Sequence, residues 1–215
     1  MSDIVLVFQG PSVLSFSTHM PAVAGCDLLW AGMTRAWIAQ QHLLSPHNLA
    51  FDWYWYSSKS LREHEGKLAA FLQTPKLIFT TEECFDFHRS TMLPHLDRTL
   101  FASREFLVGN RYNGQILCGF AFLMTLIERG LVGNRRIFLL GCDLGATYGV
   151  HDPQLHEEKA SDYQSVLCGL AAELNHDVHG IRSILDRAEI YNASPLSTLT
   201  IFPRISHFEM VEMLA

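Results

Sequence analysis

The sequence lacks the cysteine and hydrophobic patterns of secreted, metal-binding or membrane-spanning proteins. Its five cysteines lie far apart, in apolar surroundings such as LLGCDLG, and none forms a CxxC pair. We therefore expect reduced, buried thiols rather than a disulfide framework or a cysteine metal site. The opening MSDIVLVFQGPS carries no basic leader, and its apolar run is too short for a signal core or a membrane span. These features predict a cytoplasmic protein with no transmembrane segment.

Charged residues are also scarce, and acidic ones outnumber basic ones. They make up 18% of the chain, with Lys+Arg 16 against Asp+Glu 22 and a net charge of −6. A broad nucleic-acid surface needs clustered cations, so we expect no nucleic-acid partner. The chain has 215 residues, 48% of them hydrophobic, and a single core serves up to roughly 250 residues. We therefore expect one domain over residues 1–215.

Short β-rich runs alternate with longer helix-compatible ones, which predicts a single-domain, Rossmann-like α/β fold. The sheet should be mostly parallel, with helices on both faces. Strands are expected at Ile4–Phe8, Asp27–Ala31, Ala50–Tyr56, Lys76–Thr80, Arg136–Gly141 and Glu189–Asn192, and helices at Ser60–Gln73, Gly114–Arg129 and Ser161–Leu174. The first and fifth strands are continuously apolar and should be central. The segment 81–113 has weak periodicity and is a candidate lid.

The first strand runs directly into Gly10-Pro11-Ser12. Ligands of open parallel sheets lie beyond the carboxyl ends of the strands, where backbone amides can face an anion. Glycine allows close approach, proline fixes the loop and serine adds a hydroxyl. The turn therefore suits a nucleotide, although the same residues also build ordinary loops.

A second polar segment follows the apolar strand that ends at Gly141. Asp143 comes next, and the loop after it contains Tyr148, His151, Asp152 and His156. A histidine here can act as a general base near neutral pH, and an aspartate can bind a sugar hydroxyl or a metal. The histidines do not have a metal-ligand spacing, so we expect no histidine metal site. Solvated histidines and a capping aspartate are the simpler alternative.

Two further strand ends carry polar or aromatic residues. Asn192 and Ser194 end the last predicted strand, where they can contact a nucleotide or make ordinary turns. In FDWYWY, Trp53 and Trp55 share one face of a strand, and we expect both in the core.

In this order the motifs resemble a superfamily that includes the bacterial lipo-oligosaccharide sialyltransferases and the hydroxymethylpterin diphosphokinase-like proteins. The resemblance is carried by GPS after the first strand, GQILCGFAFLMTLIERG, IFLLGCDL and YNASPLS. In the sialyltransferases the loop Gly-Asn-Gly-Pro-Ser holds the nucleotide of the activated sugar, which implies this role for Gly10, Pro11 and Ser12. Gln9 and Gly32 stand where that family has asparagine.

The resemblance implies a glycosyltransferase that moves a sugar from a nucleotide-activated donor to a hydroxyl of an acceptor glycan or small alcohol. It implies a catalytic base at His151 or His156 and a leaving-group contact from Tyr148. The expected nucleotide contacts are Gly10, Pro11, Ser12, Gly141, Asp143, Asn192 and Ser194. One alternative is a Mg²⁺-dependent diphosphokinase acting on a small alcohol such as a pterin, with Asp143 or Asp152 holding the ion. The other is a protein that binds a nucleotide or a partner without turnover.

Overall fold

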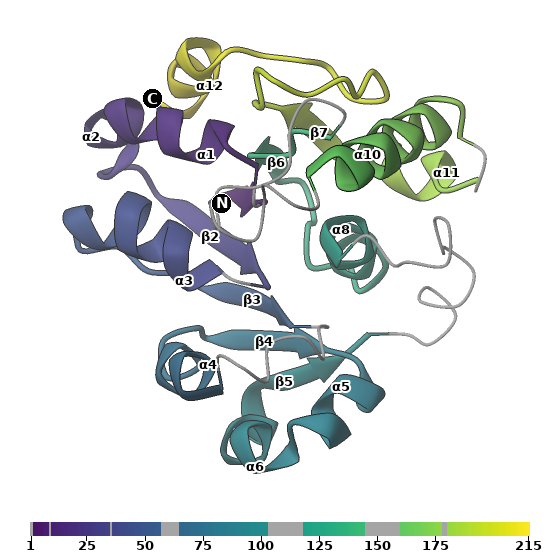
Figure 1. The fold of residues 1–215 in the computed structure, drawn as a ribbon. Helices are drawn as coiled ribbons and strands as arrows, with labels where there is room; N and C mark the ends of the chain where they lie inside the picture. The colour runs from purple at the N-terminus through teal and green to yellow at the C-terminus, as the bar shows by residue number, and fades with distance from the viewer. Residues whose placement is uncertain are drawn as a thin grey trace.

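One parallel sheet runs through the protein. The computed structural model describes residues 2–8, 10–34, 36–56, 65–102, 118–144, 160–177 and 180–215, with the backbone alone at 65, 118 and 160–167. Within these residues, seven strands pair in the order β5-β4-β3-β2-β1-β6-β7, and every neighbouring pair is parallel (Figure 1). The predicted Rossmann-like α/β class is confirmed.

The strands follow the apolar runs of the sequence. They are β1 Asp3–Val7, β2 Leu28–Met33, β3 Trp53–Tyr56, β4 Leu77–Thr80, β5 Thr99–Phe101, β6 Arg136–Leu140 and β7 Glu189–Asn192. All six predicted strands are present, and β5 is an additional short strand at the sheet edge. The two continuously apolar strands, β1 and β6, lie side by side inside the sheet. Their apolar residues are almost fully buried because both faces of the sheet are covered.

One face of the sheet is covered by α8 Cys118–Glu128, α10 Ala160–Asn175 and α11 Arg182–Leu185. The residues of α8 from Phe120 to Ile127 are all buried, as its apolar sequence predicts, and Gly130 follows the helix with φ +66°. Trp53 and Trp55 point into this core, so their expected role is confirmed. Figure 1 shows these three helices together on the side of the sheet opposite α1–α3.

The other face carries many short helices. They include α1 Ser12–Ser15, the 3₁₀ turn η1 Phe16–His19, α2 Met20–Val23, α3 Ala36–Ala39, the π-helix η2 Gln40–Leu44, the 3₁₀ turn η3 Ser45–His47, α4 Glu65–Phe71 and α12 His207–Leu214. Residues 82–98 form α5 Glu82–Phe87, α6 Arg89–Met92 and the 3₁₀ segment η5 Leu93–Arg98 before β5. The described part of the candidate lid segment is therefore a chain of short helices and an edge strand.

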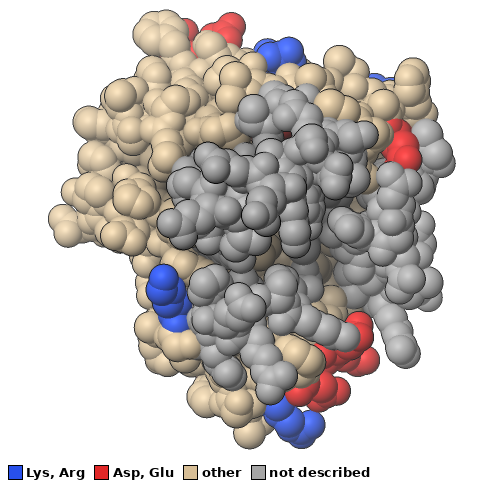
Figure 2. Space-filling model, in the orientation of Figure 1, with Lys and Arg blue, Asp and Glu red and all other residues tan. Residues whose placement is uncertain are grey.

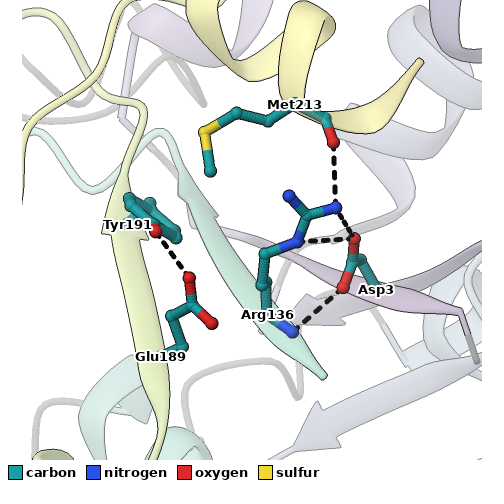
Figure 3. A network of polar contacts seen from close by, with 5 residues as sticks. All are labelled: Asp3, Arg136, Glu189, Tyr191 and Met213. Atoms are coloured by element: carbon teal, nitrogen blue, oxygen red, sulfur yellow. Dashed lines mark hydrogen bonds and ion pairs between the residues drawn. The ribbon is translucent and has the colours of Figure 1, made fainter. Parts of the chain in front are cut away.

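An arginine anchors the C-terminal helix to the amino end of the sheet (Figure 3). The Arg136 side chain donates from Nε and Nη2 to Oδ2 of Asp3, at 3.0 and 2.6 Å, and its main-chain amide donates to Oδ1. Nη2 also donates to the carbonyl of Met213, in the last turn of α12. The Arg136 side chain thus joins the start of β1 by an ion pair and the end of α12 by a hydrogen bond.

Within the described residues, no helix combines the length and apolar content needed to cross a membrane. The cysteine side chains differ in solvent exposure more than expected. Cys84 and Cys142 are buried and Cys26 is half-buried, but Cys168 is exposed. The expectation of buried thiols is therefore wrong for Cys168, because it lies on the outer side of α10.

Candidate functional site

The candidate site lies where the strand order reverses direction. Strands β2 to β5 follow one another outward on one side of β1. Strands β6 and β7, which come later in the chain, lie on the other side of β1. The reversal falls between β1 and β6, and a crevice outside the carboxyl ends of such strands is the usual ligand site of open α/β sheets. Gly10–Ser12 and Gly141–Asp143 follow these two strands directly.

The backbones that follow β1 and β6 stay paired beyond the strands. The amide of Phe8 donates to the Leu140 carbonyl at 2.7 Å, and the amide of Gly10 donates to the Gly141 carbonyl at 2.8 Å. The two predicted loops are therefore in direct contact.

Gly10 and Gly141 both lie where the structure has no room for a side chain. A Cβ on Gly10 would lie 2.4 Å from Oδ2 of Asp143, and a Cβ on Gly141 would lie 2.2 Å from a methyl of Val13. Gly141 also has φ +77°, a conformation that glycine adopts without strain. The close backbone approach that the sequence predicted is made within the protein, between the turn after β1 and the turn after β6.

Asp143 binds both donors of Ser12. The main-chain amide of Ser12 donates to Oδ2 and its hydroxyl donates to Oδ1, each at 2.7 Å. Pro11 occupies the N-cap position of α1 and offers no side-chain acceptor, so the carboxylate from the end of β6 caps this helix instead. Burial raises the pKa of Asp143, and the two hydrogen bonds from Ser12 oppose that rise.

This arrangement gives Ser12 an internal partner, and its contact with a nucleotide stays a prediction. Its amide and hydroxyl were predicted to face a nucleotide, but an internal carboxylate already accepts from both. Ser12 and Asp143 are also almost fully buried. In this geometry Asp143 acts as a positioning residue that holds the turn after β1, and a phosphate would have to bind elsewhere along the same edge.

The third predicted segment joins the same hydrogen-bonded cluster. The Ala193 amide donates to the Leu139 carbonyl at 2.9 Å, and the Ser194 hydroxyl accepts from the Cys142 amide at 2.7 Å. The Ser194 amide in turn donates to Oδ1 of Asn192 at 3.2 Å. Asn192 and Ser194 are fully buried, and Nδ2 of Asn192 has no hydrogen-bond partner in the described structure. The turn after β7 is therefore built around the end of β6.

The three catalytic predictions, Tyr148, His151 and His156, lie outside the described residues. The same holds for Asp152, the second candidate Mg²⁺ ligand. In the described part of the chain, no three His, Cys, Asp or Glu side chains are grouped so that they could hold a metal ion.

Sequence reasoning missed two contributors to this edge. Phe8, just after β1, packs edge-to-face on Phe120, and a Cβ on Gly119 would lie 2.0 Å from its ring. Gly119 of α8 therefore lies directly against the residue that follows β1. The second missed contributor is Cys142, whose main-chain amide donates a hydrogen bond to the Ser194 hydroxyl. Burial and then the charge of Asp143 raise the pKa of the Cys142 thiol well above its ordinary range, which disfavours the thiolate form.

The face shown in Figure 2 carries few described charges, and the Lys and Arg side chains appear as separate spots. The described part of this face therefore presents no continuous positive surface. Attraction for an anionic ligand would come from helix termini and backbone amides, or from residues outside the described ranges.

Comparisons of the chain with protein-family models, curated proteins and solved structures find no match.

Proposed function

We propose that the protein is a glycosyltransferase that uses a nucleotide-activated sugar, with the donor lying across the carboxyl ends of β1, β2 and β6. One observation carries the proposal: the switch point between β1 and β6 coincides with the cluster of Gly10, Ser12, Gly141 and Asp143. In open α/β sheets this position is the usual nucleotide site. The resemblance of the same segments to the sialyltransferases selects the donor class.

The proposed chemistry needs a base for the acceptor and a donor for the leaving phosphate. His151 or His156 would remove the proton of the acceptor hydroxyl, and Tyr148 would donate a hydrogen bond to the phosphate as it leaves. Each step contributes on the order of 100-fold or more to the rate. Asp143 would keep Ser12 and Gly10 in place beneath the donor and would not itself react.

A nucleotide screen tests the binding step. Thermal unfolding is followed with cytidine, uridine, guanosine and adenosine nucleotides, each with and without Mg²⁺. We expect one base to raise the melting temperature without Mg²⁺, because ligands that bind the native state stabilise it by mass action. Stabilisation by ATP alone, and only with Mg²⁺, would favour the diphosphokinase. The absence of any shift at millimolar nucleotide would refute the nucleotide site.

A double variant tests the chemical step. His151→Ala with His156→Ala should retain the nucleotide-induced shift and lose sugar transfer, measured as release of nucleotide from the donor identified in the screen. His42→Ala, at an exposed histidine of η2, is the control and should transfer normally. Undiminished transfer by the double variant would remove these histidines from the mechanism. Binding without release from any donor in a panel would identify a non-catalytic nucleotide-binding protein.

A further inference from the structure

Thr34, the residue that follows β2, has a backbone conformation that threonine rarely adopts. Its φ is +51°, in the left-handed region. Within the described part of the chain, the other non-glycine residues with positive φ are Asn48 and Asp177. Asparagine and aspartate tolerate this region, whereas a β-branched side chain is strained in it. Thr34 is therefore the strained member of this group.

The neighbouring strand β3 holds Thr34 in this conformation. The Thr34 amide donates to the carbonyl of Trp55 at 3.0 Å, and the Thr34 carbonyl accepts from the hydroxyl of Tyr54. Tyr54 is fully buried, and its ring packs edge-to-face on Phe71 with a centroid distance of 4.8 Å. Both polar backbone groups of Thr34 are thus fixed by a well-packed strand, which is the condition under which a strained residue persists.

The side chain of Thr34 is not used in the same way. It is half-buried, and its hydroxyl has no hydrogen-bond partner among the described residues. Thr80, which ends β4, provides a contrast, because its hydroxyl donates to the carbonyl of Tyr56 at 2.5 Å. The structure therefore keeps an unpartnered hydroxyl at Thr34, in a conformation that glycine adopts without strain.

Thr34 lies on the strand end next to the candidate site. Val7 of β1 pairs with Gly32 of β2, so Thr34 is two residues beyond this pair and Gly10 is three residues beyond it. Neighbouring strands are about 5 Å apart. Because β1 lies between β2 and β6, Thr34 is on the opposite side of the β1 turn from Asp143. Its hydroxyl thus belongs to the same edge of the sheet as the turn Gly10–Ser12.

We propose that the Thr34 hydroxyl binds a ribose hydroxyl of the nucleotide. The inference rests on the proposed function and names the part of the ligand that β2 recognises. In open parallel sheets that bind nucleotides, the phosphate lies near the turn after the first strand and the ribose hydroxyls are bound at the end of the neighbouring strand. A threonine hydroxyl can both donate and accept, as a ribose hydroxyl can. The strained backbone then has a function, because it fixes the position of this hydroxyl.

Deoxynucleotides test the contact. Calorimetric titration of the full chain uses cytidine, uridine, guanosine and adenosine monophosphates, each with its 2′-deoxy and 3′-deoxy forms. For the base that binds, we expect the wild type to prefer the ribonucleotide over at least one deoxy form by about 3- to 10-fold, the contribution of one neutral hydrogen bond. Thr34→Val keeps the branched shape without the hydroxyl, so its preference should fall to about onefold. Thr34→Ser should keep the wild-type preference.

Thr74→Val is the matched control, at an exposed threonine between α4 and β4, and should behave like the wild type. An unchanged preference in Thr34→Val would overturn the ribose contact and leave the nucleotide site in place. An equal loss of affinity for the ribo and deoxy forms would also overturn it. If the wild type binds none of the probes, the proposed function fails and this contact with it. If Thr34→Val does not fold, Thr34→Gly replaces it, because glycine accepts this φ, and it should lose the same preference.

Discussion

Ser12 and Asp143 are 131 residues apart in the sequence, yet two hydrogen bonds of 2.7 Å join them. Asp143→Ala removes both acceptors and leaves the buried Ser12 amide unsatisfied, so we expect the free energy of unfolding to fall by about 3 kcal/mol. Ser12→Ala should cost about 1 kcal/mol, and the double variant less than the sum, as measured by urea denaturation. The control is Asp186→Ala, at an exposed position. A loss below about 0.5 kcal/mol for Asp143→Ala would show that the pair does not hold the turn.

The glycines at the same junction should not tolerate a methyl group. We expect Gly10→Ala and Gly141→Ala each to cost about 2–4 kcal/mol, because a Cβ would overlap Asp143 or Val13 and Gly141 has a positive φ. Gly169→Ala in α10, where a Cβ has no atom within 4 Å, is the matched control. It should be neutral or stabilise by about 0.5–1 kcal/mol, because alanine favours a helix. Thermal denaturation measures all three, and equal effects would contradict the packing described.

The ion pair between Arg136 and Asp3 should require the guanidinium group. Arg136→Lys keeps the charge but cannot donate from two nitrogens to Asp3 while also reaching the Met213 carbonyl. We expect a loss of about 1–2 kcal/mol in urea denaturation. Lys76, which is 80% exposed in its ion pair with Asp52, provides the comparison. Lys76→Ala should cost less than about 0.5 kcal/mol, because exposed ion pairs contribute little. A larger effect at Lys76 would reverse this ranking.

His95 should make the protein less stable in acid. Its Nδ1 lies 2.8 Å from Nη2 of Arg98, which can only donate, so the ring is neutral in the fold. Burial, followed by the charge of Arg98, lowers the pKa of His95, with Asp97 opposing. The unfolded chain therefore binds the proton more tightly. The contribution of His95 is complete above about pH 6.5 and is lost as the pH falls through the lowered pKa.

Urea denaturation at pH 7.5, 6.5 and 5.5 measures this effect. In His95→Asn, the side-chain oxygen can still accept from Arg98 but does not titrate, so the fall in stability should be smaller than in the wild type. An identical pH dependence in the two proteins would remove His95 as a cause.

The fold was predictable where the sequence has long or continuous apolar runs. The strands β1 and β6 and the helix α8 are of this kind. The three residues of β5 and the four-residue helices α1 to α3 are too short to show a period. The predicted elements do not include α12, although the sequence contains a signal for it. Ser206 and Glu209 have the spacing of a capping box, and the structure contains that box.

For the candidate site, the sequence predicted only that the carboxyl ends of several strands lie close together. Gly10 and Gly141 indicate that the backbone must approach something closely, but local sequence does not say what. The answer depends on the strand order, which places β6 beside β1 and brings the Asp143 carboxylate to the turn after β1. A nucleotide phosphate and an internal carboxylate make the same demand on a turn, because both accept hydrogen bonds from its amides.

The position of β1 also sets an order of events during synthesis. β1 to β5 can pair successively as they leave the ribosome, but the other edge of β1 has no partner until residues 136–140 have been made. Until then the chain exposes an unpaired edge of a mostly apolar strand, which is a template for aggregation. A nascent chain of about the first hundred residues should therefore need a chaperone, and cooperative folding should begin only after β6 has emerged.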